Sequence, residues 1–448
     1  MKSVIICDME GVITEMNKGA LDLFGYDKDE LVGKKRVSIF SPGEIVIQNV
    51  LGWLEKANKE GKSLVKTNFV KKDGSKFNAE ILITPNYANG KDKEQTGYCG
   101  ITKEIKEDVN IPINFSTKIF KGIAITRGGF TLASILPMVI VAILLNQLNS
   151  LSIINTIISI IGIVSLHIFG NLYNDYFDVS SGTDGVNNEY FNVGDKSLIL
   201  RGAQISGGSR AIELGLITLS KTKKLGNIML LIALACIIII SINIFLETKS
   251  LNNIFGILAI GSLGLILTYF YTAKPLRLSA RKGLGEFVIF LTFGPLLCLG
   301  SAFAMTNTPF DLTYDNLKFF MIIGVPLGLL TTNILLINQF PDYKSDKKSK
   351  KINLVVLFGR KFSRWFYLIN LFLIFLSTFY FIQEIPKFIP LFRYNIFYFI
   401  FSIIFLYGLY IFNGLLKYYD SRKLINYNIH TIYYQIIFCL GLILIFYI

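Results

Sequence analysis

Long apolar stretches dominate the chain from about residue 130 to its end. Nine of them contain about twenty mainly apolar residues each, which is the length that a helix needs to cross the hydrocarbon core of a bilayer. They lie at 130–148, 152–174, 225–246, 253–271, 284–305, 318–337, 364–382, 395–413 and 430–448. The pattern predicts an all-α polytopic membrane bundle of about nine transmembrane helices.

The first hundred residues have a different pattern, in which short β-rich runs alternate with turn signals. Between two of these runs, Lys72-Asp73-Gly74-Ser75 predicts a hairpin turn. The predicted strands are Ser3–Asp8, Leu64–Val70, Phe77–Thr84 and Gly97–Ile101. The predicted helices are Asn17–Phe24 and Ile45–Glu60. Residues 1–108 are therefore expected to form a separate α/β domain, followed by a linker at 109–125 and a membrane domain at 126–448.

Charge separates the same two parts. Residues 1–108 carry 17 basic and 17 acidic side chains, so the net charge of +14 belongs to the remainder of the chain. A basic membrane domain is expected to face anionic lipid headgroups and phosphate-bearing substrates, and no pattern typical of nucleic-acid binding occurs. The five cysteines are scattered, which supports neither a disulfide framework nor a zinc site.

Two acidic clusters lie at the ends of apolar stretches. Carboxylates cost about 2.5–3.5 kcal/mol each at the centre of a membrane helix, so they are expected to serve a function. In each cluster two aspartates are three or four residues apart and share one helix face. The first cluster contains Asn171, Asn174, Asp175 and Asp178 and is followed by Asp184; the second contains Asn338, Asp342 and Asp346.

Facing carboxylate pairs at a membrane surface suit Mg²⁺, which binds one or two carboxylates together with the oxygens of a substrate phosphate. The clusters therefore predict a metal-assisted enzyme that acts on a lipid diphosphate. The predicted metal ligands are Asp175, Asp178, Asp184, Asp342 and Asp346.

The connections between the apolar stretches alternate in charge. Four of them contain 21 Lys and Arg residues, and the other four contain only Lys249, Lys318, Lys387 and Arg393. Basic loops are retained in the cytoplasm. This split predicts a multi-pass protein of the plasma membrane whose N-terminal domain, basic loops and acidic clusters are cytoplasmic.

The N-terminal segment contains a set of short motifs. They are Asp8-Met-Glu-Gly11-Val-Ile, Asn17-Lys-Gly-Ala20, Phe24-Gly-Tyr26, Glu30-Leu-Val-Gly33, Lys72-Asp-Gly-Ser-Lys-Phe and Gly100-Ile-Thr-Lys-Glu-Ile. With these motifs the segment resembles a PAS sensor domain over about residues 1–108. The resemblance implies an antiparallel sheet with flanking helices, a regulatory role, an unknown small ligand or partner, and a tendency to form homodimers.

A second set of motifs accompanies the acidic clusters. It consists of Arg127, Gly207-Gly-Ser-Arg210, Tyr271-Thr-Ala-Lys274-Pro-Leu-Arg277, Gly283-Leu-Gly-Glu286 and Asn353-Leu-Val-Val-Leu-Phe-Gly-Arg360. Over about residues 118–448 the chain resembles the UbiA-type intramembrane aromatic prenyltransferases. Asp184 lies six residues after Asp178, where many relatives have four, and this spacing resembles the 1,4-dihydroxy-2-naphthoate polyprenyltransferases of menaquinone synthesis.

The resemblance implies Mg²⁺-dependent transfer of a polyprenyl group from its diphosphate to an aromatic acceptor. Asp175, Asp178, Asp342, Asp346 and Lys274 are the implied catalytic residues. The implied diphosphate-binding residues are Asn171, Asn174, Arg210, Tyr271, Arg277, Asn338 and Arg127. Cationic side chains suit phosphate oxygens, and the tyrosine offers either a hydroxyl or a ring facing an allylic cation.

Alternatives remain at this point. One is the same enzyme fold with another acceptor, either a different quinone precursor or a glycerophosphate lipid. Another is a PAS-based membrane sensor with a non-catalytic bundle, against which the costly carboxylates weigh. His167 is interpreted as a packing residue rather than a catalytic one. The run Lys347–Lys351 is interpreted mainly as a topology and lipid-contact segment from which at most one lysine reaches the substrate.

Overall fold

The computed structural model describes residues 2–9, 11–180, 211–212, 215–385, 394–421 and 423–447. Two predicted site residues, Asp184 and Arg210, lie outside these ranges. The chain divides into two compact units. Met1–Gly128 belongs to the first, and Gly129–Ser180 with Thr222–Ile448 forms the second.

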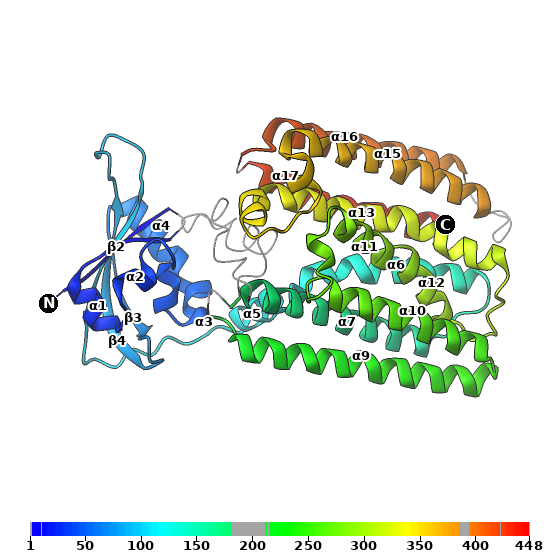
Figure 1. Ribbon diagram of the computed structural model, residues 1–448, viewed down its shortest axis with the longest axis horizontal. Helices are drawn as coiled ribbons and strands as arrows, with labels where there is room; N and C mark the ends of the chain where they lie inside the picture. Colours follow the sequence, from blue (N-terminus) through cyan, green and yellow to red (C-terminus); the bar gives the residue numbers. More distant parts are fainter. Residues whose placement is uncertain are drawn as a thin grey trace. The chain divides into compact units, whose positions relative to one another are not determined.

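A five-stranded antiparallel sheet organises the first unit (Figure 1). Its strand order is β2-β1-β5-β4-β3, so the N-terminal strand pairs with the last strand of the sheet. The strands are β1 (Ser3–Asp8), β2 (Ile13–Met16), β3 (Ser63–Val70), β4 (Lys76–Asn86) and β5 (Gly97–Glu104). The predicted antiparallel sheet is confirmed. Strand β2 was not predicted. It has only four residues at the sheet edge, and this is too short for an alternation of apolar and polar side chains to be recognised.

Short helices pack on this sheet. They are α1 (Lys18–Phe24), α2 (Lys28–Leu31), η1 (Val37–Phe40), α3 (Gly43–Ile45), the π-helical turn η2 (Val46–Val50) and α4 (Leu51–Glu60). Phe24, Phe40 and Phe69 form an aromatic core beside them. Asn17 caps α1 by accepting a hydrogen bond from the Ala20 amide at 2.9 Å, which is why the helix begins there.

An apolar cavity of about 110 Å³ lies inside the first unit. Side chains of the sheet, such as Ile81 and Tyr98, form part of its wall, and Val46 and Val50 of η2 with Trp53 of α4 form another part. Because one water needs roughly 10–15 Å³ of such space, the cavity has room for a small organic molecule.

A helix that the sequence did not predict follows the sheet. The segment expected to be a linker contains α5 (Phe115–Thr126), and this helix is attached to the α3–η2 segment. Gln48 of η2 accepts hydrogen bonds at 2.9 Å from both the Asn114 amide and the Thr117 hydroxyl. The Lys121 ammonium pairs with Glu44 of α3. The amphipathic pattern of α5 covers only twelve residues. This length is too short to separate a helix from the surrounding loop by its pattern alone.

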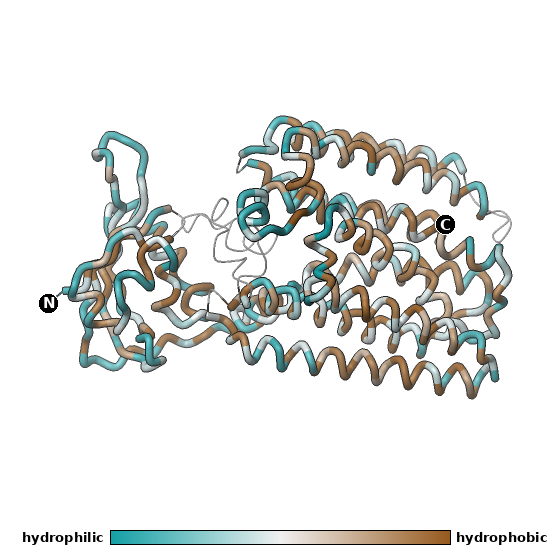
Figure 2. Tube along the Cα trace, in the orientation of Figure 1, coloured by the Kyte–Doolittle hydropathy of each residue, from teal (hydrophilic) through white to brown (hydrophobic). Residues whose placement is uncertain are grey.

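The second unit is a helical membrane bundle. Among the residues that the structure describes, nine helical segments are long and apolar enough to cross a membrane, as the apolar pattern predicted. Hydrophobic residues run along these helices (Figure 2). The helices are α6 (Leu132–Gln147), α7 (Ile153–Ser180), α9 (Leu219–Thr248), α10 (Leu251–Phe270), α11 (Leu284–Phe293), α12 (Pro295–Met305), α13 (Tyr314–Lys348), α15 (Arg360–Glu384), α16 (Tyr394–Tyr418) and α17 (Leu424–Tyr447), with short turns η3 (Gly128–Thr131), η6 (Leu278–Ala280) and α14 (Leu354–Phe358).

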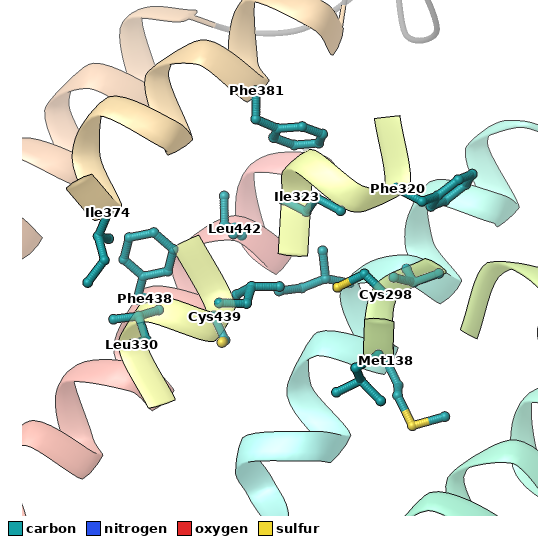
Figure 3. Close-up of a cluster of buried hydrophobic side chains, with 14 of the residues drawn as sticks. Met138, Cys298, Phe320, Ile323, Leu330, Ile374, Phe381, Phe438, Cys439 and Leu442 are labelled. Atoms are coloured by element: carbon teal, nitrogen blue, oxygen red, sulfur yellow. The ribbon is translucent and has the colours of Figure 1, made fainter. Parts of the chain in front are cut away.

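Helix α13 lies at the centre of this bundle and contributes many side chains to its core. Figure 3 shows Phe320, Ile323 and Leu330 of α13 among buried side chains from other helices. α11 and α12 form one span that is interrupted at Gly294, and there the backbone of Gly294 meets Gly324 of α13. Glycines permit this close backbone approach, as is common between membrane helices.

Candidate active site

The two acidic clusters lie in the last turns of α7 and α13. Asp175, Asp178 and Asp346 are buried, and Asp342 is half-buried. Each pair lies on one helix face because its members are three or four residues apart. In both helices, therefore, an apolar membrane-spanning part is followed by an end that carries carboxylates.

A lysine lies between the two clusters. The Nζ atom of Lys351 is 3.9 Å from Oδ2 of Asp178 and 3.8 Å from Oδ1 of Asp346. One aspartate from each cluster thus faces the same cation-sized position. Burial lowers the pKa of Lys351, but Asp346 and Asp178 raise it more, so the pKa lies above its usual value and the side chain is charged.

The loop after α13 sets the position of this lysine. Lys350 adopts a left-handed conformation (φ 57°), and the Lys351 amide donates to the Asp346 carbonyl at 2.8 Å, so the chain turns back on the helix end. Asn353 donates to Oδ2 of Asp346 at 2.7 Å and also caps α14 by accepting from the Val356 amide. Sequence reasoning treated Asn353 only as part of a family motif and Lys351 only as one of a basic run. No charge pattern separates Lys351 from its neighbours.

A second loop joins the first through the backbone. The Lys282 amide donates to the Ile352 carbonyl at 2.7 Å, and Arg281 forms a β-bridge with Ile352. The Arg281 guanidinium donates to the carbonyls of Leu276 at 2.8 Å and Pro275 at 3.1 Å, which holds the loop closed. The segment from Tyr271 to Arg277, which contains the predicted diphosphate-binding residues of this loop, is thereby attached to the loop of Lys351.

The predicted residues of this second loop differ in burial. Tyr271 is half-buried, and burial raises its pKa, with Lys351 acting in the opposite direction. Lys274 is exposed. Arg277 is half-buried and left-handed (φ 42°), and its amide donates to the Ala273 carbonyl at 2.9 Å. The loop thus combines a half-buried tyrosine and a half-buried arginine with an exposed lysine.

Glu286 of α11 accepts hydrogen bonds from two residues beside the second acidic cluster. Its Oε1 atom accepts from Gln339 at 2.9 Å and from the Leu354 amide at 2.8 Å. Gln339 lies on α13, and Leu354 begins α14 directly after the Lys351 loop. Glu286 therefore fixes the loop relative to α13. In the sequence, Glu286 was noted only as part of a family motif, and no role was assigned to it.

The asparagines of the two clusters have different surroundings. The amide oxygen of Asn338 accepts from Asn428 of α17 at 2.8 Å, which links the two helices, and its role in binding the diphosphate stays a prediction. The Oδ1 atom of Asn174 is buried and has no hydrogen-bond partner among the residues that the structure describes. Asn171 lies one turn before Asp175 and is half-buried. Asn174 thus offers an oxygen that a bound cation would satisfy.

Three other predicted residues have no tested position at this site. Asp184 and Arg210 lie outside the described residues, and Arg127 ends α5 in the first unit with a left-handed conformation (φ 51°). Their roles remain predictions. His167 forms a 2.9 Å hydrogen bond with Ser134 and contacts the edge of Phe293, which agrees with a packing role.

Comparison with known proteins identifies the two parts. Residues 135–432, more than half of the chain, match the UbiA prenyltransferase family. The chain belongs to this family. Residues 1–107 match the PAS domain, so a PAS domain precedes the UbiA membrane domain.

Individual relatives are distant. The UbiA prenyltransferase domain-containing protein 1 of Dictyostelium discoideum is 29% identical over 201 residues, covering 44% of this chain and 51% of that protein. The 1,4-dihydroxy-2-naphthoate octaprenyltransferase of Escherichia coli K12 is 26% identical over 194 residues, covering 43% and 54%. A solved structure of a UbiA homologue from Archaeoglobus fulgidus, bound to DMAPP and Mg²⁺, is 14% identical with a TM-score of 0.43, covering 72% and 99%. The chain spans about half the length of the curated relatives that it matches.

The residues of the site fit a divalent cation that is shared with a substrate. Asp178 and Asp346 already flank one cationic group, and Asn174 has a buried oxygen that no described residue binds. Within the described ranges, no three His, Cys, Asp or Glu side chains gather as a metal site. A bound Mg²⁺ would therefore take further ligands from water and phosphate, which is its usual behaviour.

Proposed function

We propose that this UbiA-family protein transfers a polyprenyl group from its diphosphate to an aromatic acceptor in a Mg²⁺-dependent reaction. The observation that carries the proposal is the position of Lys351 between Asp178 and Asp346. It indicates that carboxylates from both clusters are directed at one cationic group. A diphosphate with its metal ion needs a site of this charge pattern.

The residues of the two joined loops have complementary roles in this reaction. The acidic clusters would hold Mg²⁺, which would supply positive charge to neutralise the departing diphosphate. Lys274 and Arg277 bind phosphate oxygens, the arginine through its planar fork of donors. Lys351, held at the carboxylates, offers a further donor to the diphosphate. The apolar helices around the site exclude water that would otherwise react with the allylic carbon.

The proposed acceptor is 1,4-dihydroxy-2-naphthoate, the aromatic substrate of menaquinone synthesis. Two features support this choice: the interval of six residues between Asp178 and Asp184, and the similarity to the naphthoate octaprenyltransferase of E. coli. The basic connections support a cytoplasmic position for the site. An acceptor with a glycerophosphate headgroup is the second candidate, because the cationic loop also suits a phosphate-bearing acceptor.

We expect membranes that contain the protein to convert 1,4-dihydroxy-2-naphthoate and a polyprenyl diphosphate into a prenylated naphthoquinol, and EDTA to stop the conversion. The measurement is product detection by liquid chromatography and mass spectrometry. Membranes with 4-hydroxybenzoate or a glycerophosphate in place of the naphthoate are the matched comparisons. Product only with another acceptor would contradict the naphthoate assignment and keep the transferase. No product with any acceptor would favour a sensor with a non-catalytic bundle.

We also propose that the PAS domain regulates this reaction. Val46 and Val50 of η2 line the apolar cavity, and Gln48 between them is bonded to α5, which leads into the first membrane span. Single π-helical turns occur frequently at functional sites. A ligand that fills the cavity would press on η2 and change its contact with α5.

Gln48→Ala is expected to change turnover about two- to fivefold, because it removes hydrogen bonds worth about 1 kcal/mol between η2 and α5. Turnover of the full chain in membranes is the measurement. Gln95→Ala is the control, since Gln95 donates to Gly97 within the same domain and, in the described part of the chain, forms no hydrogen bond to α5. Equal turnover in both variants and the parent chain would count against regulation through α5.

A further inference from the structure

Helix α5 carries a row of large apolar side chains that are exposed among the described residues of the first unit. Phe115 is 78% exposed, Ile119 47%, Phe120 45% and Ile123 38%. Phe115, Ile119 and Ile123 are spaced by four residues and form one stripe along the helix. Exposed apolar patches of this kind, bordered by polar residues, mark interaction surfaces.

The opposite face of α5 is occupied by the PAS domain. Thr117 and Ala124 are buried, Thr117 donates to Gln48, and Lys121 pairs with Glu44. These contacts fix the rotation of the helix about its own axis. The apolar stripe therefore points away from the PAS domain and cannot turn inward without breaking them.

Continuity with the membrane and charge indicate what covers the stripe. α5 ends at Thr126, and the first membrane-spanning segment begins at Gly128. The sequence contains no acidic residue between Asp108 and Asp175, whereas Lys118, Lys121 and Arg127 lie on or beside α5. A helix with an apolar face and basic neighbours, joined directly to a span, suits the boundary between headgroups and acyl chains of an anionic bilayer.

We propose that the apolar stripe of α5 is a lipid-binding surface that attaches the PAS domain to the bilayer. Phe115, Ile119 and Ile123 enter the acyl boundary, and Lys118 remains at the level of the headgroups and water. Because Gln48 and Glu44 bind the other face of the same helix, the turn η2 is connected to a helix whose depth depends on the lipid surface. The surface is independent of which reaction the membrane domain catalyses.

Spin labels on the full chain in phosphatidylglycerol–phosphatidylcholine nanodiscs test this proposal. Ile119→Cys and Ile123→Cys, each made with Cys99→Ser, are labelled with a nitroxide, and Lys118→Cys and Lys59→Cys are the matched water-facing controls. Power-saturation EPR compares collisions with oxygen, which concentrates in lipid, with those of a water-soluble nickel chelate. We expect the oxygen-to-nickel ratio to be several-fold higher at 119 and 123 than at 118 and 59.

Two results would overturn the proposal. The first is a ratio at 119 and 123 equal to that at Lys59→Cys, which would place the stripe in water. The second is dipolar broadening at 119 that disappears when labelled chains are diluted with unlabelled ones, which would identify a second copy of the chain as the partner. Prenyl transfer measured on the same samples shows whether the reaction proposal fails separately.

Discussion

Asp346→Asn and Asp178→Asn are each expected to lower kcat/KM for prenyl transfer by about 10²- to 10³-fold. Each substitution removes one of the two charges that face the position of Lys351, at nearly unchanged volume. Interactions with charge that develops in a transition state contribute about 3–4 kcal/mol each in shielded sites, which corresponds to this factor. The measurement is the initial rate of transfer in membranes, at saturating Mg²⁺ and varied prenyl diphosphate.

Asp315→Asn is the matched control for these two variants. Asp315 lies on the same helix as Asp346 but in its first turn, more than twenty residues away, and is exposed. Its removal changes the net charge by the same amount, so kcat/KM is expected to stay within about twofold. Equal losses in Asp315→Asn and Asp346→Asn would indicate a general charge effect and contradict a specific role of the cluster.

Gly328→Val is expected to destabilise the membrane domain by about 3 kcal/mol or more. A Cβ atom at Gly328 would overlap the carbonyl oxygen of Phe290, and one at Gly324 would lie 2.5 Å from the carbonyl carbon of Gly294. These are backbone atoms, which cannot rotate away as a side chain can, so α11 and α12 would have to separate from α13. The measurement is the fraction of protein that stays monodisperse in detergent across a temperature ramp.

Gly264→Val provides the comparison. Gly264 lies in α10, and a Cβ atom there would meet nothing within 4 Å. Its stability is expected to remain close to that of the parent chain, because neither volume nor backbone is disturbed. A Gly328→Val protein as stable as Gly264→Val would show that the interruption at Gly294 is not a tightly packed junction.

The spans of the membrane domain follow from the sequence because length and apolarity are nearly sufficient to define a transmembrane helix. α7 and α13 exceed their predicted ranges, since each continues past its apolar part into an acidic end. In the PAS domain the main strands were predictable from alternation and turns. β2, and the helix α5 that follows the domain, were not, because short elements take their stability from neighbours, β1 for the strand and Gln48 for the helix.

The candidate site was predictable only in part. Spacing alone places Asp175 with Asp178, and Asp342 with Asp346, on common helix faces. Nothing in the local sequence indicates that Lys351, rather than Lys347 or Lys350, reaches both clusters. That selection depends on the left-handed turn at Lys350 and on the bridge between the two loops, which are tertiary features. Glu286 is likewise 68 residues from Leu354, through which it holds the loop.

EPR of bound Mn²⁺, used in place of Mg²⁺, tests whether the two acidic clusters and the substrate diphosphate share one metal ion. The spectra are recorded on the purified chain with and without an unreactive prenyl thiodiphosphate. We expect the parent chain to bind Mn²⁺ tightly only when the diphosphate analogue is present. Asp178→Asn and Asp346→Asn should each weaken this binding, and Asp315→Asn should not. Mn²⁺ binding that is equally strong in all three variants, or that ignores the analogue, would contradict a metal site shared by the two acidic clusters and the substrate.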